Sequence, residues 1–232
     1  MRGDAEMDGE RGLLGRLSER VAGALLELGG PVAYGSGEVV LREGGEDGHA
    51  VLVLTGAVKV RASDEAGDAA LLAVLSAGNL VGEMAALDGR PRSATVVACG
   101  PVTGRLIPQH QLLDFLDFHR EVLVELFRVR ADQVRWANEL RRAMPHHAAT
   151  RIARVLGHLV RQHGSRTTAG WTLDLPLTNV ELASIAGMKS RTAEKAFSRL
   201  RDAGVVMTST RRAVVVPDLP RLDLIATGRS LP

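Results

Sequence analysis

The sequence has few of the features that mark secreted or membrane proteins. Its single cysteine, Cys99, cannot form an internal disulfide, which is typical of proteins in a reducing cytoplasm. No apolar run reaches the roughly 18 residues that a membrane-spanning helix needs. Residues 1–12 are polar and lack the apolar centre of a signal peptide. We therefore expect a cytoplasmic protein with no membrane contact, whose residues 1–12 form a disordered leader.

Aromatic residues and catalytic signatures are also scarce. Aromatics make up 3% of the 232 residues, so Leu, Val and Ala must build the core. There is no P-loop, no HExxH motif, no cysteine cluster and no local grouping of Ser, His and Asp. These absences argue against an enzyme, while the length allows two domains.

Charge is abundant but unevenly distributed. The net charge is only +2, yet residues 1–145 hold 16 Lys and Arg against 21 Asp and Glu, and residues 146–232 hold 13 against 6. A basic part that follows an acidic part suggests that only the second half of the chain meets a polyanion such as nucleic acid.

Hydrophobic periodicity predicts an α+β protein. Apolar residues between Leu13 and Leu28 keep helical spacing, and from Val32 to Ile107 the period changes to two, with frequent glycine. We expect short strands over residues 38–42, 49–54, 57–61, 71–75 and 95–98. Many short strands joined by glycine turns predict an antiparallel roll over residues 13–118.

Residues 119–144 are predicted to be a long helix that pairs with a second copy of the chain. An alternation of three and four residues, over about three heptads, indicates such a seam. We expect Leu123 and Phe127 to pack on the roll instead; the alternative is a helix that lies only on its own roll. The predicted seam residues are Val122, Leu126, Val129, Gln133, Trp136 and Leu140.

The helix is expected to end at a hinge over residues 145–149. Pro145 lacks a backbone donor, and the adjacent His146 and His147 are interpreted as solvated rather than as metal ligands, because no third ligand is near in sequence.

The segment from Gly82 to Thr95 has the spacing of a ligand-binding loop. Glu83 and Arg92 stand nine positions apart, separated by a helical turn and a Gly/Pro break. An arginine fork suits a phosphodiester, and a carboxylate can accept from a ribose hydroxyl. The pattern resembles the phosphate-binding cassette of cyclic-nucleotide-binding domains; the alternative is a structural ion pair beside a turn. The effector-binding residues that the resemblance implies here are Gly82, Glu83, Met84, Arg92 and Ser93.

The basic part predicts a winged helix-turn-helix over residues 150–220, followed by a tail over 221–232. Thr178 and Glu181 form a capping box, and Gly187 permits the turn before a second helix that starts at Lys189 or Ser190. Residues 205–207 and 213–216 form a hairpin that completes the wing. We expect base contacts from Ser190, Arg191 and Lys195 and phosphate contacts from Thr178, Lys189, Ser198, Arg199, Arg211 and Arg212.

Roll, cassette, long helix, hinge and winged helix, in this order, resemble the cyclic-AMP receptor protein/FNR (Crp/Fnr) family of bacterial transcription regulators. The resemblance covers about residues 15–217. It implies a homodimer whose effector realigns the long helices and presents two reading helices to a palindromic DNA operator. RNA polymerase is a candidate partner.

The chain departs from the family pattern at three places. Counting back from Arg151 places Trp136 and Ala137 where cyclic-AMP-responsive members carry an adenine-contacting hydroxyl pair. The resemblance therefore implies that Trp136 and Ala137 are effector-binding residues, and Trp136 can stack on a base. Because they cannot replace two hydroxyl-type hydrogen bonds, cyclic AMP is not the predicted effector, and another nucleotide or none remains open. The aligned run Lys189–Thr192 holds no acid that would accept from cytosine, and Arg191 favours guanine. One cysteine excludes a four-cysteine iron–sulfur cluster, and no local pattern supports a haem ligand such as His49 or His110.

Two other functions fit the sequence. The roll could be a dimer scaffold that binds no effector, with Trp136 filling the adenine space. Alternatively, the chain could be a nucleotide-gated regulatory protein whose basic domain binds a protein partner.

Overall fold

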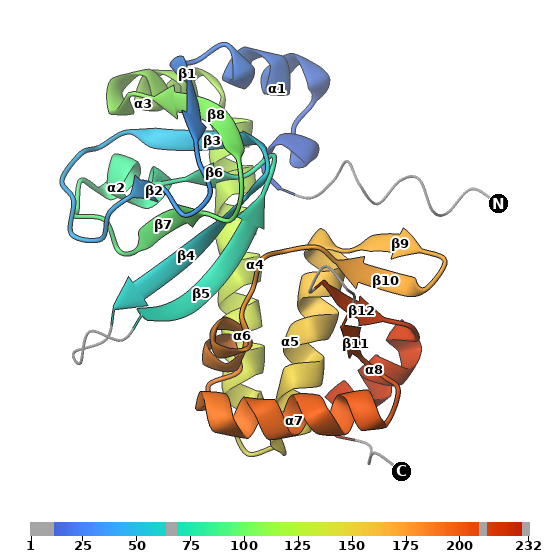
Figure 1. The fold of residues 1–232 in the computed structure, drawn as a ribbon. Coiled ribbons are helices and arrows are strands. Elements are labelled where there is room, and N and C mark those ends of the chain that lie inside the picture. Colours follow the sequence, from blue (N-terminus) through green and yellow to red (C-terminus); the bar gives the residue numbers. More distant parts are fainter. Residues whose placement is uncertain (1–11, 64–68, 209–212, 229–232) are drawn as a thin grey trace. The chain divides into compact units, whose positions relative to one another are not determined.

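Short strands fill most of the first half of the chain and helices most of the second (Figure 1). The computed structural model describes residues 12–63, 69–208 and 213–228. The chain divides into two units, Met1–Val134 and Arg135–Pro232, and each is described by itself. The predicted leader falls almost wholly outside the described residues.

In its described residues, the first unit has two antiparallel four-stranded sheets, ordered β1-β8-β3-β6 and β2-β7-β4-β5. This arrangement confirms the predicted roll, and the predicted strands shift by one or two residues at their ends. The strands are β1 (Gly30–Tyr34), β2 (Val39–Leu41), β3 (Ala50–Thr55), β4 (Ala57–Ser63), β5 (Ala69–Ser76), β6 (Leu80–Val81), β7 (Thr95–Ala98) and β8 (Val102–Ile107).

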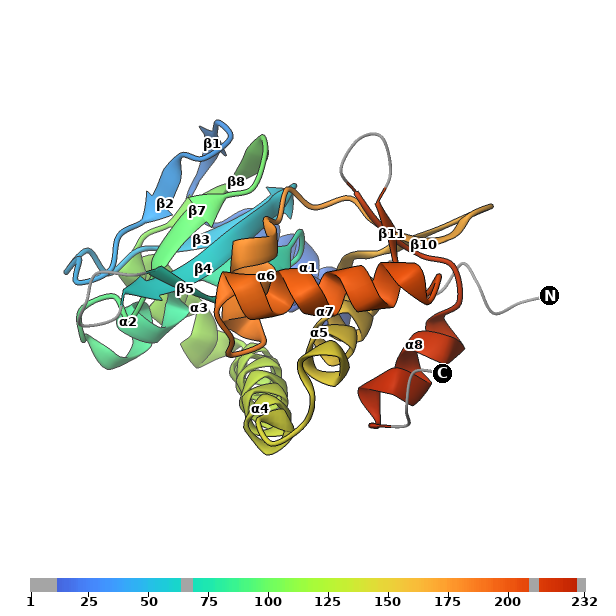
Figure 2. The same cartoon turned by 60° about the horizontal axis from the view of Figure 1, so that its bottom comes forward.

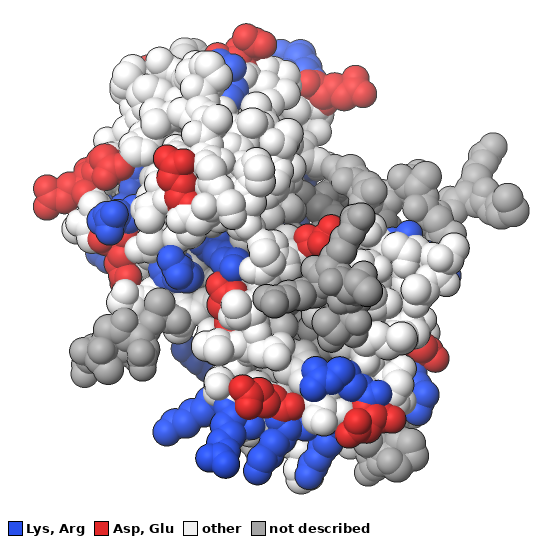
Figure 3. Space-filling view, in the orientation of Figure 1, with Lys and Arg blue, Asp and Glu red and all other residues white. Residues whose placement is uncertain are grey.

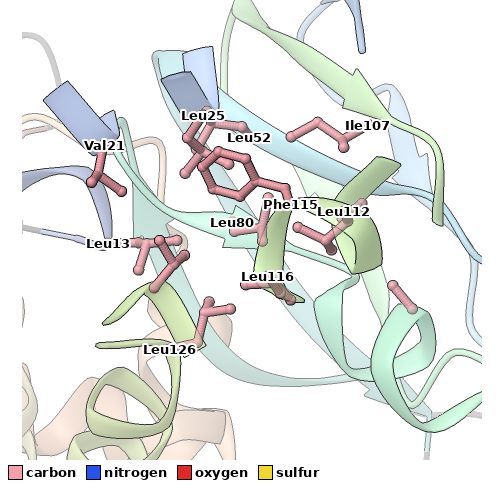
Figure 4. Close-up of a cluster of buried hydrophobic side chains, with 13 residues drawn as sticks. Leu13, Val21, Leu25, Leu52, Leu80, Ile107, Leu112, Phe115, Leu116 and Leu126 are labelled. Atoms are coloured by element: carbon pink, nitrogen blue, oxygen red, sulfur yellow. The ribbon is translucent and has the colours of Figure 1, made fainter. Parts of the chain in front are cut away.

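Alternation along β3 divides the apolar core of this unit into two clusters. Val51 and Val53 point between the sheets, where they meet Val58 and Val96. Leu52 points to the opposite face, because successive side chains of a strand alternate. There it joins a second cluster, built mainly by the helices (Figure 4).

The helices of the first unit cover that outer face. They are the 3-10 turn η1 (Leu14–Arg16), α1 (Glu19–Leu26), the cassette helix α2 (Glu83–Asp88), α3 (Gln109–Phe118) and the start of α4 (Arg120–Ala143). The predicted first helix is broken at Ser18, which is the N-cap of α1.

The long helix α4 exists as predicted, but the face assigned to a second subunit is wrong at its first positions. Val122 and Leu126 are 0% and 3% exposed and belong to the protomer's own core. Figure 4 labels Leu126 among the residues of this cluster. Leu123 and Phe127, which we expected on the roll, are 46% and 72% exposed. Both pairs have a spacing of four, and helical periodicity alone does not say which of two adjacent apolar rows faces the core.

The second unit contains the predicted winged helix-turn-helix. Its elements are α5 (Ala148–His163), β9 (Ser165–Thr167), β10 (Gly170–Leu173), α6 (Asn179–Ile185), α7 (Ser190–Asp202), β11 (Met207–Thr208), β12 (Val214–Val216) and α8 (Leu219–Ala226). The four strands form one antiparallel sheet, ordered β11-β12-β10-β9, in the described residues. The apolar side of α7 packs across α5 (Figure 2).

The C-terminal segment is not the tail that we predicted. Residues 219–226 form α8, which Asp218 caps by accepting from the Arg221 backbone N–H. Leu222 and Ile225 are buried against α5, and Arg161 of α5 pairs with Asp223. This helix therefore extends the folded domain beyond residue 220.

The predicted hinge corresponds to a short connection. α4 ends at Ala143 and α5 begins at Ala148, so residues 144–147 join the two helices. Among the described residues, no helix combines the length and the apolar character needed to span a membrane.

Candidate effector pocket and candidate nucleic-acid interface

A pocket in the first unit brings together the predicted cassette residues. Apolar strand residues, the beginning of α2, the chain that follows α2 and one residue of α4 form its walls. The lining residues are Val60, Leu75, Val81, Glu83, Met84, Ala85, Arg92, Ser93, Ala94, Val96 and Arg130. Gly82 precedes this set directly, as the N-cap of α2.

Arg92 is held by the protein itself. The residue is 4% exposed. Its Nη1 donates to the Gly82 carbonyl oxygen at 2.7 Å, and its Nη2 donates to the His49 carbonyl oxygen and lies 3.4 Å from the Asp47 carboxylate. Arg92 therefore connects the cassette to the chain before β3 through contacts within the protein, and these contacts do not depend on a ligand.

Gly82 makes room for this arginine. Its φ is +81°, and a Cβ at this position would lie 2.5 Å from Arg92 Nη1. The effector-binding role that the resemblance implied for Gly82 stays a prediction. In the structure, the close approach is made by the Arg92 guanidinium.

Glu83 is paired with a residue that the sequence did not predict. The carboxylate is buried, and its Oε1 lies 2.6 Å from Nη2 of Arg130 on α4. Burial raises the pKa of Glu83, and Arg130, a backbone hydrogen bond and Arg92 act in the opposite direction. The carboxylate thus carries a desolvation cost that a cation offsets only in part.

Asp47 and His49 complete the surroundings of Arg92. His49 Nδ1 lies 3.0 Å from the Asp47 carboxylate. Burial lowers the pKa of His49, with Asp47 opposing this shift and Arg92 adding to it. Burial would raise the pKa of Asp47, but a backbone hydrogen bond and Arg92 outweigh it and lower the pKa. Arg92 therefore favours an ionised Asp47 beside a neutral His49.

Two arginines that line the pocket each keep a buried donor without a partner in the described part of the chain. Among the described residues, the Nε–H groups of Arg92 and Arg130 are buried and have no hydrogen-bond partner. Buried donors without partners are rare, and a phosphate oxygen would satisfy them. Glu83 offers an acceptor for a hydroxyl, and Val60, Leu75 and Val96 give an apolar wall.

Arg130 is the residue of this site that sequence reasoning missed. It follows Val122 and Leu126 at intervals of four residues, so it lies on the stripe of α4 that faces the roll. The sequence did hold a signal for Arg130, because a cation on the apolar side of an amphipathic helix indicates a buried partner of opposite charge.

The structure places Trp136 against α5, and the effector contacts predicted for Trp136 and Ala137 stay a prediction. The Trp136 ring stacks on the ring of His158 in α5, with centroids 3.8 Å apart and planes within 5°. Trp136 lies six residues beyond Arg130, about 9 Å along α4 and about 120° around it. Ala137 is exposed, about two turns beyond Arg130. The α4 residue that lines the pocket is Arg130.

In the second unit, α6 begins and ends as predicted. The Thr178 side chain accepts from the Glu181 backbone N–H at 3.1 Å, and the Thr178 N–H donates to the Glu181 carboxylate at 2.8 Å. Gly187, with φ of +63°, makes the turn to α7, and a Cβ there would lie 2.3 Å from Met144 Cε. Arg151 holds the same turn, because its Nη1 donates to the Gly187 carbonyl oxygen at 3.2 Å.

The outer face of α7 carries the predicted DNA-contacting residues. Ala193, Ala196, Phe197 and Leu200 are buried, which leaves the other side of the helix free. Arg191, Lys195, Ser198 and Arg199 are exposed, and so are Thr178 and Lys189, whereas Ser190 is half-buried. Arg211 and Arg212 lie outside the described residues.

Basic side chains gather around this helix. Figure 3 shows Lys and Arg along the edge of the second unit that carries α7, with a few acidic side chains between them. Such a surface attracts a polyanion. An exposed helix with a basic face after a capped helix and a glycine turn has the geometry of a helix-turn-helix.

Two family models match the chain. The model described as cyclic nucleotide-binding domain matches residues 31–119, and the model described as Crp-like helix-turn-helix domain matches residues 150–225. The chain belongs to the Crp/Fnr family. As a Crp/Fnr transcription regulator it is not an enzyme, and it combines a cyclic-nucleotide-binding domain with a DNA-binding domain.

Similar Crp/Fnr proteins are known from several bacteria. The chain is 23% identical to a protein of Mycobacterium tuberculosis named "CRP-like cAMP-activated global transcriptional regulator", over 83% of this chain and 86% of that protein. The structure of FixK2 from Bradyrhizobium japonicum shares the fold with a TM-score of 0.71 and 21% identity, over 84% of this chain and 96% of FixK2. A regulator of Xanthomonas campestris described as the c-di-GMP responsive CLP has a TM-score of 0.69 and 20% identity, over 87% of this chain and all 100% of CLP.

In the part of the chain that the structure describes, no group of three or more His, Cys, Asp or Glu side chains could hold a metal ion. Asp47 contacts His49, and His110 is exposed on α3.

Proposed function

We propose that this Crp/Fnr protein is a homodimeric, sequence-specific DNA-binding regulator whose roll binds a small anionic effector. The observation that carries the DNA-binding part is the outer face of α7, where Arg191, Lys195 and Arg199 are exposed on a helix whose other side is buried. A regulator bound beside a promoter also meets RNA polymerase, which we include as a proposed partner.

On DNA, the first turns of α7 lie in the major groove. Ser190, Arg191 and Lys195 read base edges, and Arg191 suits the two acceptors of guanine. Thr178, Lys189, Ser198 and Arg199 contact phosphates, together with Arg211 and Arg212 of the wing. The phosphate contacts supply affinity and the base contacts supply specificity.

The proposed dimer uses a different face of α4 from the one that the sequence suggested. Val124, Phe127 and Val134 are 48%, 72% and 60% exposed, and with Ala131 and Asn138 they repeat every three and four residues, as in a coiled coil. Asn138 would fix the register of the two helices, as polar residues in such seams do. Two-fold symmetry then predicts a palindromic operator with half-sites about 34 Å apart.

For the effector, we propose a cyclic nucleotide held by Arg92, Arg130 and Glu83. The orphaned Nε–H groups of the two arginines support a phosphate, and the buried carboxylate supports a hydroxyl. The two relatives are named for different nucleotides, cAMP and c-di-GMP, so the family alone does not choose between them.

A specific observation favours a second version, in which the roll needs no effector. Glu83 already pairs with Arg130, and the terminal nitrogens of Arg92 already donate to backbone carbonyls. These contacts stabilise the pocket from within and would hold α4 on the roll without a ligand.

Titration calorimetry with cAMP, cGMP and c-di-GMP distinguishes the two versions. We expect a saturable heat with one nucleotide that disappears in Arg130→Gln. Arg128→Gln is the matched control, since Arg128 is an exposed arginine of the same helix. If no nucleotide produced heat and the protein still bound DNA, the version in which the roll needs no effector would be favoured. If the protein bound no DNA, either with or without nucleotide, the proposed function as a DNA-binding regulator would be contradicted.

A further inference from the structure

The reading face of α7 carries one acidic residue in its first turns, Glu194. The neighbouring acids of the second unit have structural tasks: Glu181 closes the capping box, Asp218 caps α8, and Asp223 pairs with Arg161. Glu194 is exposed, and among the described residues it has no hydrogen-bond or ion-pair partner. It is therefore a free carboxylate on a basic face.

Helix geometry places Glu194 within the group of proposed base readers. It follows Arg191 by three residues, which is about 4.5 Å along the axis and about 60° around it. Ser198 follows Glu194 by four residues, and around the helix axis it lies between Arg191 and Glu194. Arg191, Glu194, Lys195 and Ser198 together span an arc of about 100°, the part of a helix that faces the floor of a groove.

A carboxylate at this place is unfavourable unless it meets a donor. The phosphates on both sides of the groove repel it, and most base edges in the groove offer acceptors. The donors there are the amino groups of cytosine and adenine. In adenine the acceptor N7 stands beside the amino group and repels a carboxylate, whereas cytosine offers its amino group without an adjacent acceptor.

We propose that Glu194 accepts a hydrogen bond from the amino group of a cytosine on the base pair next to the one that Arg191 reads. This inference rests on the proposed DNA-binding function and names part of the operator. The separation of the two residues along α7 is close to the rise of about 3.4 Å between base pairs. Each half-site then holds a guanine for Arg191 and a cytosine for Glu194 at neighbouring positions.

Selection of bound duplexes from a random pool, with the full chain and with Glu194→Gln, tests this inference. The pools contain cAMP, cGMP, c-di-GMP or no nucleotide. The wild-type chain is expected to enrich one cytosine per half-site over adenine by about tenfold. In Glu194→Gln the same position is expected to change to adenine, because glutamine pairs with the amino group and N7 of adenine.

Asp202→Asn is the matched control. Asp202 is an exposed acid at the end of the same helix, about 12 Å beyond Glu194, and its replacement should leave the motif unchanged. An unchanged motif in Glu194→Gln, with affinity altered equally for all sequences, would overturn the inference. A loss of guanine preference alone would also overturn it, because Glu194 would then only orient Arg191. A wild-type pool with no enriched sequence would overturn the proposed function as well.

Discussion

At the scale of single residues, Arg92 combines a structural role in the fold with the proposed role in effector binding. Its terminal nitrogens hold the Gly82 and His49 carbonyl oxygens, and its buried Nε–H has no partner among the described residues. A buried cation needs partners, and removal of one member of such a network leaves the others unsatisfied. Arg92 is therefore as much a part of the fold as of the site.

We expect Arg92→Met to be less stable than the wild-type protein. The substitution should lower the free energy of unfolding of the first unit by about 3 kcal/mol, because buried carbonyls and a carboxylate lose their donor. Urea unfolding followed by circular dichroism measures it. Arg90→Met, at an exposed residue of the same cassette, should change it by less than about 0.5 kcal/mol. Equal stabilities of the two variants would contradict the role of Arg92 in the fold.

The residues of the cassette could be predicted from the sequence because they follow each other within one short segment. Arg130 could not be reached in this way, since its contact with Glu83 spans 47 positions and depends on how α4 lies on the roll. The neighbour of Trp136 was not predictable for a related reason. Counting along a helix fixes a position on that helix but not the neighbour that the side chain meets, which is His158.

At the scale of elements, α4 shows how two apolar rows divide one helix. The row that includes Val122 and Leu126 is buried in the protomer, and Arg130 continues it into the pocket. The row that includes Phe127 and Val134 is left exposed by the part of the chain that the structure describes. Exposed apolar side chains in a heptad pattern indicate a partner helix.

The double variant Phe127→Asp/Val134→Asp should therefore be a folded monomer. Sedimentation is expected to show the dimer dissociation constant raised by at least about a hundredfold, since four carboxylates would meet in one seam. Circular dichroism should be unchanged, because both side chains are exposed in the protomer. Arg128→Asp, at an exposed residue of the same helix that is not part of the seam repeat, should remain dimeric. A double variant that remains dimeric would contradict a seam formed by Phe127 and Val134.

The contact of α4 with α5 makes the stability of the second unit depend on pH. Burial, with His163 and Arg161 nearby, lowers the pKa of His158 from 6.5 to about 4. Below pH 6.5 the unfolded chain binds a proton that the folded chain does not. Stability is therefore complete above pH 6.5 and is lost as the pH falls from 6.5 towards 4.

We expect the second unit to lose up to about 3 kcal/mol over this range, and His158→Phe to lose less, because phenylalanine keeps the stack without titrating. Tryptophan fluorescence follows this unit alone, since both tryptophans of the chain, Trp136 and Trp171, lie in it. Identical pH profiles for the two proteins would show that His158 does not set the dependence.

At the scale of the whole molecule, the order of modules was predictable because each has a local signature. Period-two strands with glycines predicted the roll, and Thr178, Glu181 and Gly187 predicted the helix-turn-helix. The end of the domain was not predictable in the same way. α8 is short, and it is stabilised by burial of Leu222 and Ile225 on α5 rather than by a strong helical pattern of its own.

The central prediction is that the α7 helices of two protomers bind the two half-sites of one palindromic operator. Fluorescence anisotropy with a selected operator, across a range of salt concentrations, tests this most directly. We predict that insertion of about five base pairs, half a helical turn, between the half-sites weakens binding by at least about a hundredfold. We also predict a slope of log affinity against log salt of roughly −7 for about eight phosphate contacts. Equal affinity for the operator, the lengthened operator and a scrambled duplex would contradict the account.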